Sequence, residues 1–145
     1  MPQSAKPLSF KVGSKELFMK VVQTSAAPAA IGPYSQAVMS GPFVFTSGQI
    51  PITVGTGELL GASIEEQAEQ AIANLAAVLK AANSSLDKVV KTTCFLTDMA
   101  HFEAFNKVYA RHFTGKPARS TVAVRQLPRN ALVEIEAVAE VSNGY

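Results

Sequence analysis

One arginine and two glutamates near the end of the chain are the side chains best suited to chemistry. Arg119 follows Lys-Pro-Ala at the head of a predicted strand, and Glu134 and Glu136 lie in the otherwise apolar stretch 133–141. A guanidinium binds a carboxylate through two parallel, charge-assisted hydrogen bonds. Residues i and i+2 of a strand share one face. We therefore expect Arg119 and Glu134 at the ends of two neighbouring strands, as an anion clamp beside a proton-transferring carboxylate.

Arg119 and the two glutamates could also be ordinary surface residues without a role in catalysis or binding. Arg119 could form an ordinary surface ion pair, and the glutamates could belong to a solvent-facing row that ends at Glu140. Glutamate is uncommon in strands, so two of them on one face indicate either a solvated edge or a site. In a half-dry cleft, such a carboxylate would have a raised pKa and could pass protons.

Three residues earlier in the chain could add hydrogen-bond donors to this site. Ser47 offers a hydroxyl, Gly48 a backbone amide, and Tyr34, in a loop rich in proline and glycine, a phenol. A glycine inside a predicted strand often marks a bulge or the close approach of a ligand. The sequence has no phosphate-binding loop and no dinucleotide fingerprint. These features predict a small acidic ligand that is handled without a cofactor.

The composition is that of one globular domain. The chain has 145 residues, of which 48% are hydrophobic and 17% charged, with a formal net charge of +2. This charge is too small to predict a nucleic-acid partner, and no apolar stretch is long enough to span a membrane. No secretory signal is visible, so we expect a cytoplasmic protein, with the mitochondrion as the alternative.

The single cysteine and the two histidines offer little further chemistry. Cys94 lies within a predicted strand, where it is either a small buried hydrophobic residue or a reactive thiol. His101 and His112 fall in one predicted helix without a carboxylate or thiol at ligand spacing, so we expect no metal site.

Periodicity predicts a two-layer sandwich of two helices on one sheet. A helix should begin at Ser63, with Glu66 completing a capping box, and a second should follow Asp98. Strands are expected at 17–24, 43–50, 86–97, 119–127 and 131–141. Two helices cover only one face of a sheet, so we expect a homo-oligomer that covers the other, partly apolar face.

Four stretches of the sequence are similar to the Rid family, also called YjgF/YER057c/UK114, and specifically to its RidA-type members. They are APAAIGPYSQAV (27–38), VFTSGQIP (44–51), VVKTTCFLTDMAHFEAFN (89–106) and PARSTVAVRQLPRNALVEIEA (117–137). The resemblance implies an α+β, chorismate-mutase-like fold and a homotrimer with active sites in the clefts between subunits. It assigns residues 17–145 to one family domain and leaves 1–16 as an N-terminal extension, either a mobile arm or a cloning remnant.

The resemblance also implies hydrolysis of 2-imino acids, such as 2-iminobutanoate and 2-iminopropanoate, to 2-oxo acids and ammonia. Arg119 would hold the substrate carboxylate and Glu134 would activate water. The pocket would be completed by Tyr34, Ser47, Gly48, Asn106 and Thr121. Thr121 stands where many family members have a cysteine, so no thiol is available there. Alternatives are a ribonuclease or translation inhibitor, a chaperone-like protein, or a carboxylate-binding protein without turnover.

Overall fold

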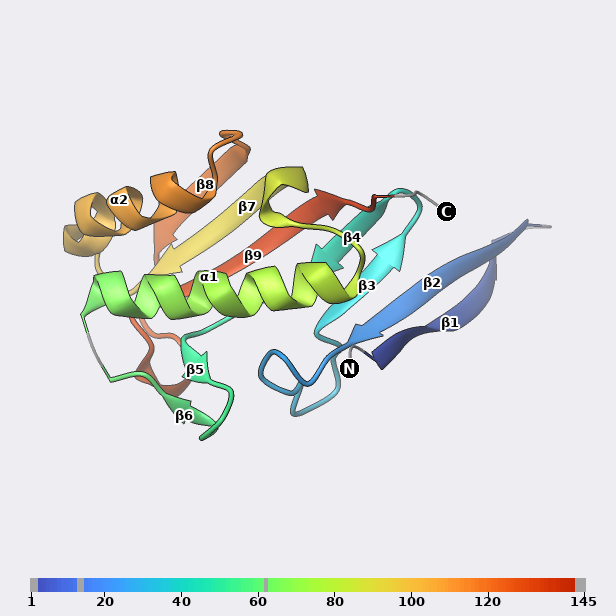
Figure 1. The fold of residues 1–145 in the computed structure, drawn as a ribbon, viewed down its shortest axis with the longest axis horizontal. Helices are drawn as coiled ribbons and strands as arrows, with labels where there is room; N and C mark the ends of the chain where they lie inside the picture. Colours follow the sequence, from blue (N-terminus) through green and yellow to red (C-terminus); the bar gives the residue numbers. More distant parts are fainter. Residues whose placement is uncertain (1–2, 13–14, 62, 143–145) are drawn as a thin grey trace.

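The main feature of the fold is a seven-stranded sheet with two helices on one face (Figure 1). The computed structural model describes residues 3–12, 15–61 and 63–142. The strand order is β1-β2-β3-β4-β9-β7-β8. The bounds are Gln3–Val12 (β1), Lys15–Gln23 (β2), Ala37–Ser40 (β3), Phe43–Thr46 (β4), Val89–Leu96 (β7), Ala118–Ala123 (β8) and Val133–Glu140 (β9). Ile52–Thr53 (β5) and Glu58–Leu59 (β6) form a small separate hairpin.

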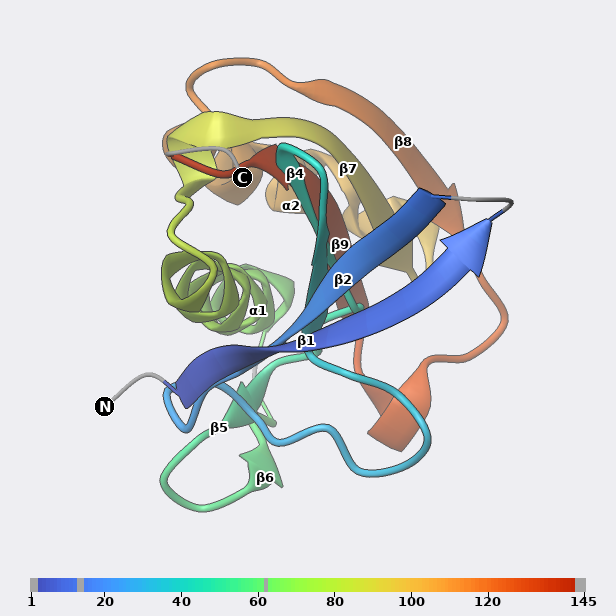
Figure 2. The same cartoon turned by 90° about the vertical axis from the view of Figure 1, so that its right-hand side faces the viewer.

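The sheet is mixed because one strand pair is parallel. β7 and β8 run in the same direction, and the chain between them crosses over through the short 3₁₀ helix Met99–His101 and the helix α2 (Phe102–His112). The other neighbouring strands of this sheet pair antiparallel. This architecture confirms the predicted α+β fold with two helices on one side of the sheet (Figure 2).

The helix α1 (Ile64–Ala81) begins as its sequence predicts. Ser63 is the N-cap, and its hydroxyl accepts a hydrogen bond from the Glu66 backbone N–H at 3.2 Å. The apolar stripe of α1 packs on the sheet, and its residues Leu75 and Val78 are fully buried. Asp98 caps the next helical segment by accepting a hydrogen bond from the Ala100 N–H at 2.8 Å. Both capping predictions are confirmed.

Two parts of the sheet differ from the prediction. The strand β3 lies in a stretch where no strand was expected. The chain turns from β3 into β4 at Gly41, whose φ of +59° suits glycine. The strands that carry Arg119 and Glu134 are not neighbours, because β7 lies between β8 and β9. The expectation of two adjacent strands is wrong, because the parallel crossover places β8 at the outer edge of the sheet.

The face of the sheet opposite the helices carries apolar side chains. Val38, Phe45 and Val138 lie in register across β3, β4 and β9. Phe45 is 46% exposed, and Val122 on β8 is 44% exposed. Glu134 and Glu136 lie on this face of β9, because Ile135 between them is buried in the core. We call this surface the open face.

Among the described residues, no helix has both the length and the apolar character that crossing a membrane requires. β1 pairs along its length with β2 and so extends the sheet at the edge opposite β8.

Candidate active site

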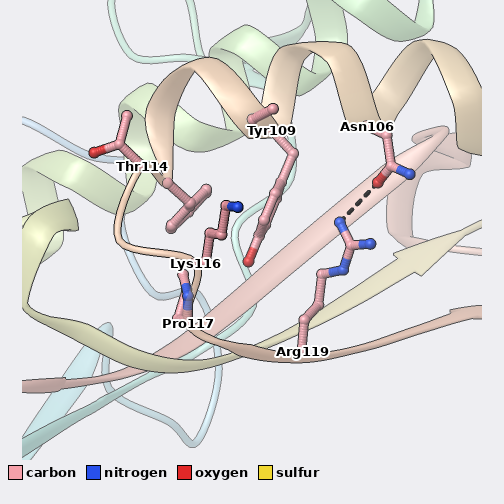
Figure 3. A pocket seen from close by; sticks show the side chains of 8 residues that line it. Asn106, Tyr109, Thr114, Lys116, Pro117 and Arg119 are labelled. Atoms are coloured by element: carbon pink, nitrogen blue, oxygen red, sulfur yellow. Dashed lines mark hydrogen bonds between the residues drawn. The ribbon is translucent and has the colours of Figure 1, made fainter.

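Arg119 is held on the helix-covered side of the sheet by residues of α2. Its Nη1 donates a hydrogen bond to Asn106 Oδ1 at 2.7 Å. Its guanidinium carbon lies 4.6 Å from the centre of the Tyr109 ring and 5.5 Å from that of Phe102. Figure 3 shows Arg119 rising from β8 toward Asn106, beside the ring of Tyr109. The structure therefore brings Arg119 and Asn106 together, and it gives the guanidinium no carboxylate partner among the described residues.

Arg119 and Asn106 line an open cleft of about 720 Å³ between α2 and the start of β8. Tyr109 and Phe113 form part of its wall, and Lys116 adds a second positive charge. The cleft is therefore positively charged and partly aromatic, and is suited to a small organic anion. The surface ion pair that was the alternative interpretation of Arg119 is absent from the described part of the chain.

Thr121 and Cys94 lie in register on the neighbouring strands β8 and β7, and neither lines this cleft. The Oγ1 atom of Thr121 is buried and has no hydrogen-bond partner within the described residues. Cys94 is fully buried, and burial raises the pKa of its thiol to about 11. A thiol with this pKa is protonated at neutral pH and is a poor nucleophile. Cys94 is therefore a small core residue, the first of its two interpretations.

Glu134 belongs to a second cleft, of about 120 Å³, together with Tyr34 and Gly48. Burial, and then repulsion by Glu136, raise the pKa of the Glu134 carboxyl group. A raised pKa makes this carboxylate a better proton acceptor near neutral pH. The structure thus brings together three of the predicted site residues, and Glu134 is half buried among them.

Gly48 allows Glu134 to lie against the backbone. A Cβ atom at Gly48 would be only 2.6 Å from Glu134 Cδ, closer than two carbon atoms can approach. The close approach that a strand glycine predicts is real, but the group that approaches is the glutamate of the same chain. Any side chain at this position would displace the carboxylate.

Buried hydrogen bonds fix the loop that carries Tyr34. Gln36 is buried, accepts a hydrogen bond from the Thr24 N–H at 2.7 Å and donates to the Pro28 carbonyl at 2.8 Å. Ser47 donates from its hydroxyl to the Ser35 carbonyl at 2.5 Å. The Ser47 hydroxyl is therefore engaged in holding this loop. Tyr34 itself is 55% exposed.

Within one chain, the two clefts lie on opposite faces of the sheet. Glu134 is flanked by Val133 and Ile135, which are fully buried under the helices, so its side chain lies on the open face. Arg119 contacts α2, so its side chain lies on the helix-covered face. Arg119 and Glu134 of the same chain therefore cannot act on one small molecule.

Tyr109 and Lys116 also line the cleft, although the sequence predicted no function for either residue. Tyr109 follows Asn106 by three residues, so the two share one face of α2. This spacing is a signal in the sequence, but an apolar helix face equally explains a tyrosine. Lys116 has a positive φ of 53° just before Pro117, and no sequence pattern distinguishes it from a surface lysine.

Known proteins resemble the chain along most of its length. The sequence pattern of the family described as Endoribonuclease L-PSP matches residues 24–141. The chain belongs to this family, the Rid (YjgF) family. A Rid relative, the 2-iminobutanoate/2-iminopropanoate deaminase of Mus musculus, is 45% identical over 124 residues, which cover 85% of this chain and 92% of the mouse protein.

Solved structures of Rid proteins share the fold. The Rid-family protein YyfA of Yersinia pestis superposes with a TM-score of 0.83 at 48% identity, over 85% of this chain and 99% of that one. The Escherichia coli protein TdcF, solved with bound serine, superposes with a TM-score of 0.80 at 42% identity, over 85% and 99% of the two chains.

Proposed function

We propose that this protein hydrolyses 2-imino acids, such as 2-iminobutanoate and 2-iminopropanoate, to 2-oxo acids and ammonia. The observation that carries the proposal is that the Arg119 guanidinium keeps N–H donors that no described residue engages. A guanidinium has five N–H donors, and Asn106 engages one nitrogen, so donors remain for a bidentate grip on a carboxylate. The name of the mouse relative and the serine bound to TdcF agree with a site for small amino-acid-like carboxylates.

The complete site would form between two subunits of a homotrimer. Arg119 and Glu134 lie on opposite faces of one sheet, so the clamp of one subunit needs the carboxylate of another. The open face, with Phe45 and Val122 half exposed, is a surface that a second copy would cover. Arg119, Asn106 and Thr121 would then come from one subunit, and Tyr34, Ser47, Gly48 and Glu134 from its neighbour.

Hydrolysis requires one water molecule and one proton relay. Arg119 would fix the substrate carboxylate, and Glu134 would take a proton from water as the water oxygen bonds to C2 and the C=N π electrons move to nitrogen. Glu134 then returns this proton to the nitrogen, which gives a carbinolamine. It next relays the hydroxyl proton to the nitrogen, so that the C–N bond breaks, ammonia leaves and the oxygen forms the carbonyl of the 2-oxo acid. Imines hydrolyse readily in water, so positioning and this relay supply enough catalysis.

The direct test is to trap imines in the presence of the protein. A pyridoxal-phosphate threonine dehydratase supplies the imine and semicarbazide traps it, so an active protein lowers semicarbazone formation. Arg119→Ala should abolish this effect while the oligomer survives, because the carboxylate loses its partner. Arg125→Ala, an exposed arginine beyond the end of β8, is the matched control and should retain activity. Full activity of Arg119→Ala would refute the assignment.

Ribonuclease activity is the second candidate, because the family description names an endoribonuclease. Cleavage by a pair of histidines does not suit this chain. His101 and His112 lie at opposite ends of α2, roughly 16 Å apart along the helix, and His112 is bonded to Glu69. An RNA degradation assay on the same preparations, with Arg119→Ala as the control, separates the two functions.

A further inference from the structure

We infer that Tyr109 is a positioning residue whose ring holds Arg119 in the orientation that binds the substrate carboxylate; this rests on the proposed function. Three residues of α2 contact the guanidinium: Phe102, Asn106 and Tyr109. Their spacing of four and then three residues places them on one helix face. Tyr109 is the nearer of the two rings, at 4.6 Å compared with 5.5 Å for Phe102.

Tyr109 is itself fixed at both ends. Its side chain descends from α2, and its hydroxyl forms a 2.7 Å hydrogen bond with Oγ1 of Thr92 on β7. Thr92 is fully buried and lies in register with Arg119 on the neighbouring strand. The ring therefore joins α2 to the strand next to Arg119 (Figure 3), and it cannot move away from the guanidinium without breaking a buried hydrogen bond.

The packing around the ring adds to this restraint. Phe113 stacks on Tyr109 with the ring centres 4.3 Å apart and a 22° angle between planes, and Phe105 approaches to 5.7 Å. Tyr109 is 7% exposed, so little water separates it from its neighbours. A cation held near an aromatic ring is attracted more strongly when the pair is shielded from water.

This arrangement explains how a flexible side chain on an edge strand can act as a rigid clamp. The Tyr109 ring supports the guanidinium without engaging any of the guanidinium's N–H donors. Asn106 fixes the guanidinium from the side through one hydrogen bond. The remaining N–H groups can then donate to a carboxylate without first being ordered, which removes an entropic cost of binding. Tyr109 thus acts on the substrate through Arg119.

The test is the affinity for 2-oxobutanoate, a stable 2-oxo acid, measured by calorimetric titration of the full-length, assembled protein. Tyr109→Leu removes the ring and should raise the Kd about tenfold. Tyr109→Phe and Thr92→Val remove opposite ends of one hydrogen bond. Each should raise the Kd about threefold, and the double variant should be no weaker than either single variant.

Phe105→Leu is the control for a purely structural role. Phe105 is fully buried in the same aromatic cluster, but the structure records no contact between it and Arg119. This variant should lower the Tm at least as much as Tyr109→Leu and leave the Kd unchanged. The inference is overturned if Tyr109→Leu binds as tightly as the wild type, or if the Kd follows the Tm across all variants.

The same titration separates this inference from the proposed function. If the wild type binds 2-oxobutanoate and Arg119→Ala does not, the carboxylate clamp holds, and the Tyr109 variants alone decide the role of the ring. If the wild type does not bind, or Arg119→Ala binds equally well, the clamp itself is wrong and the positioning role falls with it.

Discussion

At the scale of single residues, the candidate general base depends on the absence of a side chain at Gly48. Glu134 lies so close to this glycine that one added carbon would overlap it. The carboxylate is at the end of a flexible side chain, so it can move aside at little cost in stability. A general base that moves by about 1 Å can lose on the order of a hundredfold in rate. Gly48 therefore matters for activity more than for folding.

Gly48→Ala should lower kcat/KM for imine hydrolysis by about tenfold to a hundredfold while the urea unfolding midpoint changes little. The reason is the 2.6 Å contact between the new Cβ and Glu134 Cδ. The semicarbazide assay gives the rate. Gly55→Ala is the matched control, since a Cβ at Gly55 would meet no atom within 4 Å, and it should behave as the wild type. Normal activity of Gly48→Ala would show that the position of Glu134 does not matter.

The residue types of the candidate site could be predicted from the sequence, but the strand order that separates Arg119 from Glu134 could not. Arg119 and Glu134 stand out because a guanidinium after a rigid turn and a carboxylate in an apolar strand are both unusual. The pairing of β8 with β7 is long-range, and no local pattern records that β7 separates the two residues. The support of Arg119 by Tyr109 was missed for the same reason, because it needs a helix and a distant strand to meet.

At the scale of elements, the long periodic segments α1, α2, β7 and β9 were predicted well, whereas β1 and the shortest strands were not. α1, α2, β7 and β9 each bury a regular set of side chains, and this regularity is visible in the sequence. β3 has four residues, and β5 and β6 have two each, too few for alternation to be recognised. Their positions depend on pairing with distant strands.

The two helices are linked by Glu69, and this link should depend on pH. Glu69 of α1 contacts Arg111 and His112 of α2, each at 2.7 Å. The hydrogen bond from Arg111, aided by His112, lowers the pKa of Glu69 against the opposing effect of burial. A lowered pKa means that this stabilisation is present above the carboxyl group's unfolded pKa of 4.5 and is lost as pH falls through the folded value.

Glu69→Gln should therefore lower the free energy of unfolding by about 0.5 to 1 kcal/mol at neutral pH, since the pair is partly exposed. The difference from the wild type should shrink when urea unfolding is repeated in acid. Glu58→Gln, which changes an exposed glutamate without a recorded ion pair among the described residues, is the control. A difference that stays constant across pH would mean that the carboxylate charge of Glu69 plays no part.

At the scale of the whole molecule, the sheet separates the clamp from the carboxylate. The helix-covered face presents Arg119, and the open face presents Glu134 together with the apolar side chains of Phe45 and Val122. In the predicted homo-oligomer, a second copy of the chain would have two effects. It would cover the apolar open face, and it would bring Glu134 to the Arg119 of its neighbour. A monomer would have neither a protected open face nor a complete pair of catalytic groups.

The most direct test of this account is to mix two inactive variants. The Arg119→Ala variant lacks the clamp, and the Glu134→Gln variant lacks the base. The two variants are unfolded and refolded together in equal amounts, so that their subunits assemble at random. About three quarters of such trimers are mixed and each has one intact site in three, so the mixture should recover about a quarter of wild-type imine hydrolysis. Each variant refolded alone should stay inactive. A mixture as inactive as its two components would contradict a site shared between subunits.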